Sequence, residues 1–154
     1  GSEMCIRDSL RFPEGKWYED VFTIPAVLRQ ARYILRSDKG LYYYCSRQGS
    51  ISNTFCDKGI NDLLQANLML YHTLSDNTDL SEQDLDEAYL HLCDHQIMRI
   101  QFGGYLCIPE RKIPLHRALF TPRPLNYRIK AILKALSGNH YCSIVARTRK
   151  VLKR

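Results

Sequence analysis

Residues 12–52 read FPEGKWYEDVFTIPAVLRQARYILRSDKGLYYYCSRQGSIS, and the interpretation of the chain starts from this stretch. At its centre two carboxylates, Glu19 and Asp20, follow two aromatic residues, Trp17 and Tyr18. Acidic residues favour the first turn of a helix, where the helix dipole stabilises negative charge. A carboxylate can also act as a general base that takes a proton from an attacking hydroxyl. The residues alone leave both interpretations open.

The residues after Asp20 carry a helical pattern and then two strand patterns. An amphipathic helix is predicted, and its apolar face would consist of Val21, Ile24, Leu28 and Ala31. Asp20 or Thr23 is expected to cap the helix, because Pro25 is tolerated only near a helix start. Residues 33–35 and 41–45 predict short strands, since strands favour aromatic and branched side chains. A Ser-Asp-Lys-Gly turn separates them.

This stretch resembles the C-terminal half of a family 2 glycosyltransferase catalytic domain of the GT-A fold. In that family F-x-E-G-x-x-Y-E-D opens a helix, and LYYYR-x-R-x-GS-I follows roughly twenty residues later. The matching residues are Phe12, Glu14, Gly15, Tyr18, Glu19, Asp20, Leu41, Tyr42, Tyr43, Tyr44, Arg47, Gly49, Ser50 and Ile51. The resemblance therefore implies an α/β fragment dominated by helix, a GT-A-like part with a helix and short strands, followed by an all-helical basic region.

The resemblance also implies roles for the central residues. Asp20 would be the catalytic base of an inverting transfer from a nucleotide sugar to a cell-surface polysaccharide or lipid-linked glycan. Glu19 would orient the acceptor or the loop. Trp17 and Tyr18 would bind the acceptor, because aromatic faces stack on sugar rings. The alternative for both aromatic residues is packing beneath the loop.

The residues that the resemblance assigns to donor binding come from the second motif, LYYYR-x-R-x-GS-I. Arg47, Gly49 and Ser50 would contact the donor diphosphate, because Arg offers a planar fork to phosphate and Gly lets the backbone come close. Cys45 stands where the family has another Arg, which removes one cation from this cluster. The resemblance further implies a magnesium or manganese ion in the full-length enzyme. That ion would be held mainly by an Asp-x-Asp motif in the family's N-terminal half, and none is expected to be held by this chain alone.

The chain divides into four parts on this interpretation. Residues 1–9 (GSEMCIRDS) resemble a translated adapter sequence, and we expect them to be non-native or disordered. Residues 10–55 would be the C-terminal part of the transferase domain, 56–104 a helical hairpin, and 105–154 a Pro-containing linker with basic helices. Because only eleven residues precede Phe12, we expect the donor half to be missing and the fragment to be inactive alone.

Helical spacing predicts the two helices of the 56–104 hairpin. The apolar face of the first is Ile60, Leu63, Leu64, Leu68, Tyr71 and Leu74. The second begins after Ser81 as N-cap, with Asp84 three residues on as in a capping box. Its apolar residues are Leu85, Tyr89, Leu92 and Ile100, and Gly103 with Gly104 ends it.

Residues 105–124 contain four prolines and predict an irregular surface segment. Two basic amphipathic helices are predicted after it, the first ended by Gly138 and the second beginning near Tyr141. The apolar stripe of the first consists of Leu125, Ile129, Ile132, Leu133 and Leu136.

The charges are divided sharply along the chain. Residues 57–94 contain nine acidic residues and one Lys, whereas 111–154 contain twelve Lys or Arg and no acid. The basic segment can be a solvated surface, or it can bind nucleic acid or an anionic membrane. No recognised nucleic-acid motif is present, so a membrane partner is favoured and no nucleic acid is expected. The alternative to a transferase is a non-enzymatic basic helical module that binds one of these polyanions.

The remaining features favour a reduced, intracellular setting. Six scattered cysteines without a Cys-x-x-Cys pair predict free thiols in the cytoplasm. The basic amphipathic helices, together with the family resemblance, favour peripheral attachment to the inner face of the plasma membrane. His91, Cys93 and His95 do not form a convincing metal set, because Cys93 falls on a different helix face from the two histidines. No metal site is therefore expected in this chain.

Overall fold

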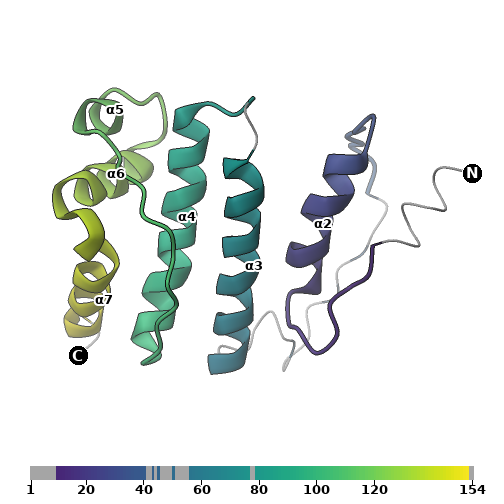
Figure 1. Cartoon of the computed structure of the whole chain (residues 1–154), viewed down its shortest axis with the longest axis horizontal. Helices are drawn as coiled ribbons and strands as arrows, with labels where there is room; N and C mark the ends of the chain where they lie inside the picture. The colour runs from purple at the N-terminus through teal and green to yellow at the C-terminus, as the bar shows by residue number, and fades with distance from the viewer. Residues whose placement is uncertain are drawn as a thin grey trace, which may run out of the picture.

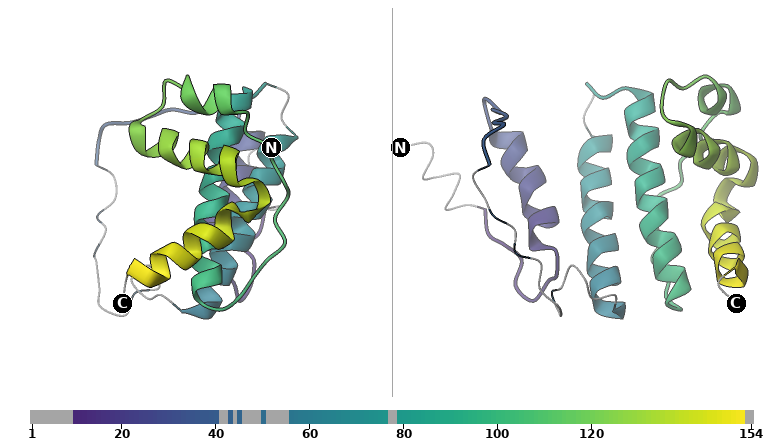
Figure 2. Two further views of the ribbon diagram at one scale, coloured as in Figure 1. Left: turned by 90° about the vertical axis from the view of Figure 1, so that its left-hand side faces the viewer. Right: turned by 180° about the vertical axis from the view of Figure 1, so that it is seen from behind.

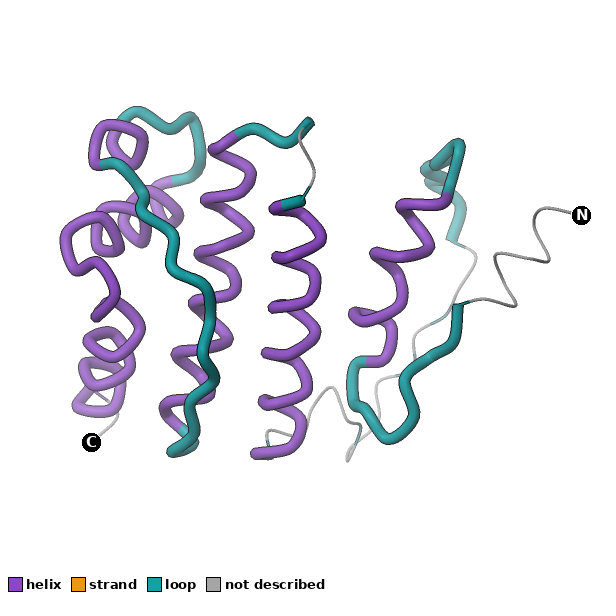
Figure 3. The backbone as a smooth tube through the Cα atoms, in the orientation of Figure 1, coloured by secondary structure: helices purple, strands orange, loops and turns teal. Residues whose placement is uncertain are grey.

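The computed structural model describes residues 10–40, 43, 45, 50, 56–76 and 79–152. This part of the chain is dominated by helix and contains no strand (Figure 1, Figure 3). The helices are α2 (Glu19–Gln30), α3 (Asp57–Ser75), α4 (Glu82–Gln101), α5 (Leu115–Leu119), α6 (Leu125–Ser137) and α7 (Tyr141–Leu152). A 3-10 turn (Gly138–His140) joins the last two.

The helices form a row along the long axis of the molecule (Figure 1). α2, α3 and α4 lie side by side, and α5, α6 and α7 form the end of the row that also holds the C-terminus. α4 packs against α3 on one side and against α6 and α7 on the other, so it is the central helix. An irregular segment, 104–114, runs back along α4 to the short helix α5 (Figure 3).

The core lies between α3, α4 and the C-terminal helices. Leu64 of α3 and Leu92, Cys93 and Ile97 of α4 are almost completely buried. Of the apolar faces predicted for these two helices, the fully buried members are Ile60, Leu64, Tyr71, Leu85, Tyr89 and Leu92. Burial of such side chains stabilises the fold by about 1.5–3 kcal/mol each. The helical hairpin prediction is therefore confirmed.

The helix ends predicted at Ser81, Gly103 and Gly138 are also confirmed. The Ser81 hydroxyl oxygen accepts a hydrogen bond from the backbone N–H of Asp84 at 3.2 Å, as an N-cap should. The same hydroxyl donates to the Asp84 carboxylate at 2.6 Å, and this bond lowers the pKa of Asp84. Gly103, at φ +82°, ends α4, and Gly138, at φ +55°, ends α6. Both glycines supply the left-handed backbone that a helix end favours.

Ion pairs join the acidic residues of α4 to cations of the basic segment, residues 111–154. Asp86, with its side chain only 1% exposed, accepts hydrogen bonds from Arg111 at 2.6 Å and Arg117 at 2.5 Å. Further ion pairs join Arg111 and Arg117 to Glu82, Arg123 to Asp84 and Glu87, and Lys130 and Arg149 to Asp94. Five cations of the basic segment are thus bound within the molecule.

Three sequence predictions need correction. Residues 33–35 are irregular and exposed instead of a strand, since no described segment lies beside them to complete a ladder of hydrogen bonds. The predicted strand 41–45 lies largely outside the described residues. The segment 105–124 contains the helical turn α5 where only irregular structure was expected. The apolar face predicted for α2 is largely exposed.

Four residues of the apolar stripe predicted for α6 are exposed, namely Leu125, Ile129, Leu133 and Leu136, whereas Ile132 packs against the core. No helix in the described part of the chain combines the length and the apolar character needed to cross a bilayer.

Candidate functional site

The loop before α2 is fastened to α3 by one buried carboxylate, Asp62. Its side chain is 4% exposed, and it accepts the Trp17 backbone N–H at 3.1 Å. The Lys16 ammonium donates to Asp62 at 3.1 Å, and the Lys58 ammonium donates at 2.6 Å. Lys58 also donates to the carbonyl oxygen of Gly15 at 2.6 Å. This cluster fixes the path of the chain into α2, because one carboxylate joins the backbone and two cations.

The environment of Asp62 favours its ionised form. Desolvation alone would raise its pKa, but the hydrogen bonds from Lys58, the Trp17 N–H and Lys16 together lower it. Lys16 is further held by the side-chain oxygen of Gln65 at 2.7 Å. Two lysines share one carboxylate, so the cluster carries a net positive charge beside the candidate site.

Trp17 packs directly on the first turn of α3. A Cβ atom at Gly59 would lie 2.7 Å from the Trp17 ring, closer than real contacts allow, so only glycine fits beneath the ring. The Lys58 ammonium lies 5.9 Å from the ring centroid, within the range of a cation–π interaction. The half-buried ring thus anchors the loop, and its role in acceptor binding stays a prediction.

Tyr18 turns the chain from this loop into α2 through a strained backbone. It adopts φ +59° and ψ +43°, and it is the one non-glycine residue with positive φ in the described part of the chain. Such a conformation costs roughly 1–2 kcal/mol for a residue with a Cβ. Burial raises the pKa of the Tyr18 phenol, and the nearby Cys56 thiol raises it further.

Glu19 and Asp20 form the first turn of α2, directly after this strained residue. No side chain caps the helix, so the predicted cap by Asp20 or Thr23 is wrong. Asp20 Oδ1 accepts the Val21 N–H at 2.9 Å, and the Thr23 hydroxyl donates to the Glu19 carbonyl at 2.9 Å. Both carboxylates are exposed, and the helix N-terminus favours their negative charge.

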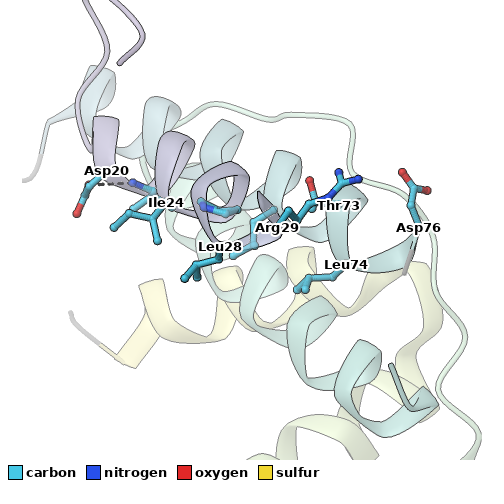
Figure 4. A pocket seen from close by; sticks show the side chains of 10 residues that line it. Asp20, Ile24, Leu28, Arg29, Thr73, Leu74 and Asp76 are labelled. Atoms are coloured by element: carbon cyan, nitrogen blue, oxygen red, sulfur yellow. Dashed lines mark hydrogen bonds between the residues drawn. The ribbon is translucent and has the colours of Figure 1, made fainter. Parts of the chain in front are cut away.

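A groove of about 790 Å³ runs between α2 and α3, with Asp20 at one end (Figure 4). Its other end is polar, with Arg29, Thr73 and Asp76. The walls between are mainly aliphatic and consist of Val21, Ile24, Pro25, Leu28, Leu70 and Leu74. An exposed carboxylate at the end of an apolar groove is a plausible arrangement for deprotonating a hydroxyl on a ligand held there.

The predicted donor residues are only partly described. Ser50 is half-buried and belongs to no helix or strand, whereas Arg47 and Gly49 lie outside the described residues. Cys45, the departure from the family pattern, is exposed. The assignment of Arg47, Gly49 and Ser50 to phosphate binding stays a prediction.

The described residues offer no fit for a divalent ion. They contain no group of three His, Cys, Asp or Glu side chains that could hold a metal ion. The His91 and His95 rings contact each other edge to face, with their centroids 4.7 Å apart. His95 Nδ1 lies 3.0 Å from the His91 carbonyl oxygen. Burial, and then the neighbouring His91, lower the pKa of His95. Cys93 is buried in the core.

Sequence reasoning missed Asp62, which joins the loop to the helical core. The spacing of Lys58 and Asp62 at i and i+4 is a visible signal for an ion pair on α3. Nothing in the sequence indicates that the Trp17 backbone completes this cluster from 45 residues away.

No protein-family model, no curated protein and no solved structure matches the chain.

Proposed function

We propose that this chain carries the acceptor side of an inverting glycosyltransferase of the GT-A fold, with Asp20 as the catalytic base. The observation that carries the proposal is the strained Tyr18 directly before the Glu19–Asp20 pair. Strained backbone persists where surrounding structure holds it, and it clusters at active sites. Here the surrounding structure is the Asp62 cluster and the contact of Trp17 with Gly59.

The proposed reaction uses the exposed carboxylate of Asp20. The acceptor hydroxyl gives its proton to Asp20 while its oxygen forms a bond to the anomeric carbon of the donor sugar. The bond from that carbon to the donor phosphate breaks, and the nucleoside diphosphate leaves with the electron pair. Attack from the side opposite the leaving group inverts the configuration at the anomeric carbon. Glu19 and Tyr18 would position the acceptor.

The groove supports an acceptor that combines a sugar with an apolar group. Its aliphatic walls offer a favourable surface to such a group, and Asp20 lies where a hydroxyl at the end of the ligand would be placed. A lipid-linked glycan has this character. The proposal places the reaction in the cytoplasm, at the inner face of the plasma membrane.

Binding of the nucleotide-sugar donor requires residues beyond those that the structure describes. The described part of the chain is helical and has no α/β unit that could bind a nucleotide. We therefore predict that the 154-residue chain alone transfers no sugar, and that transfer needs a nucleotide-binding unit encoded in the same reading frame. Robust turnover of nucleotide sugars by the purified chain would contradict this.

The experiment is a transfer assay on the protein expressed from the complete genomic reading frame. A panel of nucleotide sugars and lipid-linked acceptors is compared for the wild type, Asp20→Asn and the control Asp38→Asn. Asp38 is almost fully exposed, and its one described ion pair, with Arg36, is at 4.0 Å. Loss of a general base lowers kcat by about 10²–10⁴-fold. Equal rates for Asp20→Asn and the wild type would refute the assignment of Asp20.

A further inference from the structure

Four residues of the apolar stripe of α6 face away from the core, and only Ile132 packs against it. Leu125 and Leu136 are 69% and 71% exposed, and Ile129 and Leu133 are 50% and 46% exposed. These four residues share one helix face at three- and four-residue spacing. Large aliphatic side chains gathered on one exposed face of a helix mark an interaction surface more often than a solvated one.

The orientation of α6 is fixed by its opposite face. Ala131 is fully buried, and its small side chain lets α6 approach the core closely. Lys134 is only 4% exposed, and its ammonium donates to the Gly138 carbonyl oxygen at 2.8 Å and lies 5.3 Å from the centroid of the Tyr89 ring. Rotating α6 to bury its stripe would expose Ala131 and separate the Lys134 ammonium from the Tyr89 ring of α4. The outward stripe is thus a consequence of the packing.

α7 adds a cationic face to the same end of the molecule. Ile144 and Val151 are 50% and 72% exposed, and Arg147 and Lys150 are exposed beside them. α6 and α7 form the outermost layer at the end that faces the viewer in the left-hand view of Figure 2. We call the exposed aliphatic and cationic residues of these two neighbouring helices the α6–α7 face; they are Leu125, Ile129, Leu133, Leu136, Ile144, Arg147, Lys150 and Val151.

The charge left on this face is positive. The ion pairs with α4 neutralise five cations of the basic segment, but Arg147 and Lys150 have no ion-pair partner among the described residues. Residues 111–154 contain no acid. Aliphatic and cationic side chains without acids are the composition of helices that lie in the interface of an anionic bilayer.

We propose that the α6–α7 face binds the surface of an anionic lipid bilayer. The α6 aliphatics enter the boundary between headgroups and acyl chains, and Arg147 and Lys150 contact the anionic headgroups. A nucleic acid would leave the aliphatics unused, because protein–nucleic acid interfaces are polar and bind phosphate. A second copy of the face would bring cations against cations. This inference does not depend on glycosyl transfer.

The test is co-sedimentation of the 154-residue chain with phosphatidylcholine vesicles that contain or lack phosphatidylserine. We expect binding to the phosphatidylserine vesicles that weakens with salt, and at least about tenfold weaker binding to the neutral ones. The double variant Leu125→Asp/Leu136→Asp should lose at least about tenfold in affinity. Its control is Ile34→Asp/Leu35→Asp, at 69% and 93% exposure outside the face, which should bind like the wild type.

A second variant pair keeps the test decisive if the first disturbs α6. Arg147→Glu/Lys150→Glu should weaken binding to anionic vesicles by about tenfold or more, whereas Arg32→Glu/Lys39→Glu, also exposed, should change it much less. Far-UV circular dichroism checks folding. Wild-type binding by either variant of the α6–α7 face would overturn the proposal. So would a dimer lost in Leu125→Asp/Leu136→Asp without lipid, or binding to duplex DNA in place of vesicles.

Discussion

The segment 10–40 and the helical core formed by 56–152 are held together in different ways. In the core, Leu64, Leu92 and Ile97 are essentially excluded from water. In α2, Ile24, Val27 and Leu28 are 49%, 43% and 47% exposed, and the one fully buried residue of that helix is Thr23. The segment that carries the Glu19–Asp20 pair is therefore joined to the core by the Asp62 cluster, the Trp17 ring and a partly exposed contact between α2 and α3.

This difference suggests a division of roles, in which the helical core is the scaffold and the N-terminal segment carries the candidate site. Functional residues commonly lie on loops that a rigid scaffold positions. Here the scaffold is α3, and the loop is set on it by Asp62, Lys16, Lys58 and the Trp17 ring. We expect perturbations of the core to change global stability, and perturbations of the Asp62 cluster to change the position of the site while the helices remain folded.

The largest expected effect compares two leucines in the two regions. Leu64→Ala removes a fully buried side chain and should destabilise the core by about 2–5 kcal/mol. Leu28→Ala, at 47% exposure, should cost less than about 1 kcal/mol. Urea unfolding followed by far-UV circular dichroism measures both. Equal losses would mean that α2 is part of the same core.

The second-largest effect is expected at the Asp62 cluster, which attaches the loop before α2 to α3. Asp62→Asn removes the charge that holds Lys16 and Lys58, and it should weaken docking of the loop by about 1–3 kcal/mol. Trp17 is the only tryptophan, so its emission reports the loop directly. We expect a red shift and stronger acrylamide quenching with unchanged helix content, and no change for Asp38→Asn. An unshifted emission in Asp62→Asn would contradict the role of this cluster.

The attachment should also depend on pH. The pKa of Asp62 is lower in the folded chain than in the unfolded chain. Its contribution to stability is therefore fully present above the ordinary pKa of aspartate, about 4. It is lost as the pH falls through the lowered value, when Lys16 and Lys58 lose their partner. Trp17 emission should therefore shift to the red at acid pH in the wild type. In Asp62→Asn this transition should be absent, and its persistence there would assign it to another group.

A smaller effect should separate two glycines of the N-terminal segment. Gly15 adopts φ +70°, so Gly15→Ala should cost about 1 kcal/mol even though no atom stands within 4 Å of the added Cβ. Gly40 has equally open surroundings and no positive φ, and Gly40→Ala should stay within about 0.5 kcal/mol of the wild type. Chemical unfolding monitored by Trp17 emission distinguishes them, and identical midpoints would remove the case for strain at Gly15.

Local signals were sufficient to predict the long helices. Apolar spacing, the Ser81 cap and the glycines at 103 and 138 located helices that the structure contains. The same spacing could not say which face of α6 meets the core, because periodicity groups residues without naming the neighbour. The decisive facts, burial of Ala131 and Lys134, depend on packing against distant residues such as Tyr89.

The site was predictable only in its local part. The Glu19–Asp20 pair at a helix start follows from the sequence, and the structure has it in the first turn of α2. The strain at Tyr18 and the bond from Trp17 to Asp62 do not follow, because both depend on residues far apart in the sequence. Likewise, the charge division did not indicate that α4 binds five of these cations within the molecule, because those ion pairs depend on how distant segments pack.

The most direct test of the two-region account is one urea titration of the wild-type chain with two probes. Trp17 emission follows the loop and α2, and far-UV circular dichroism follows mainly the longer helices of the core. The account predicts that the emission changes at lower urea than the helix signal, because the N-terminal segment detaches first. Coincident transitions would contradict it, since they would mean that the segment with Glu19 and Asp20 unfolds only together with the core.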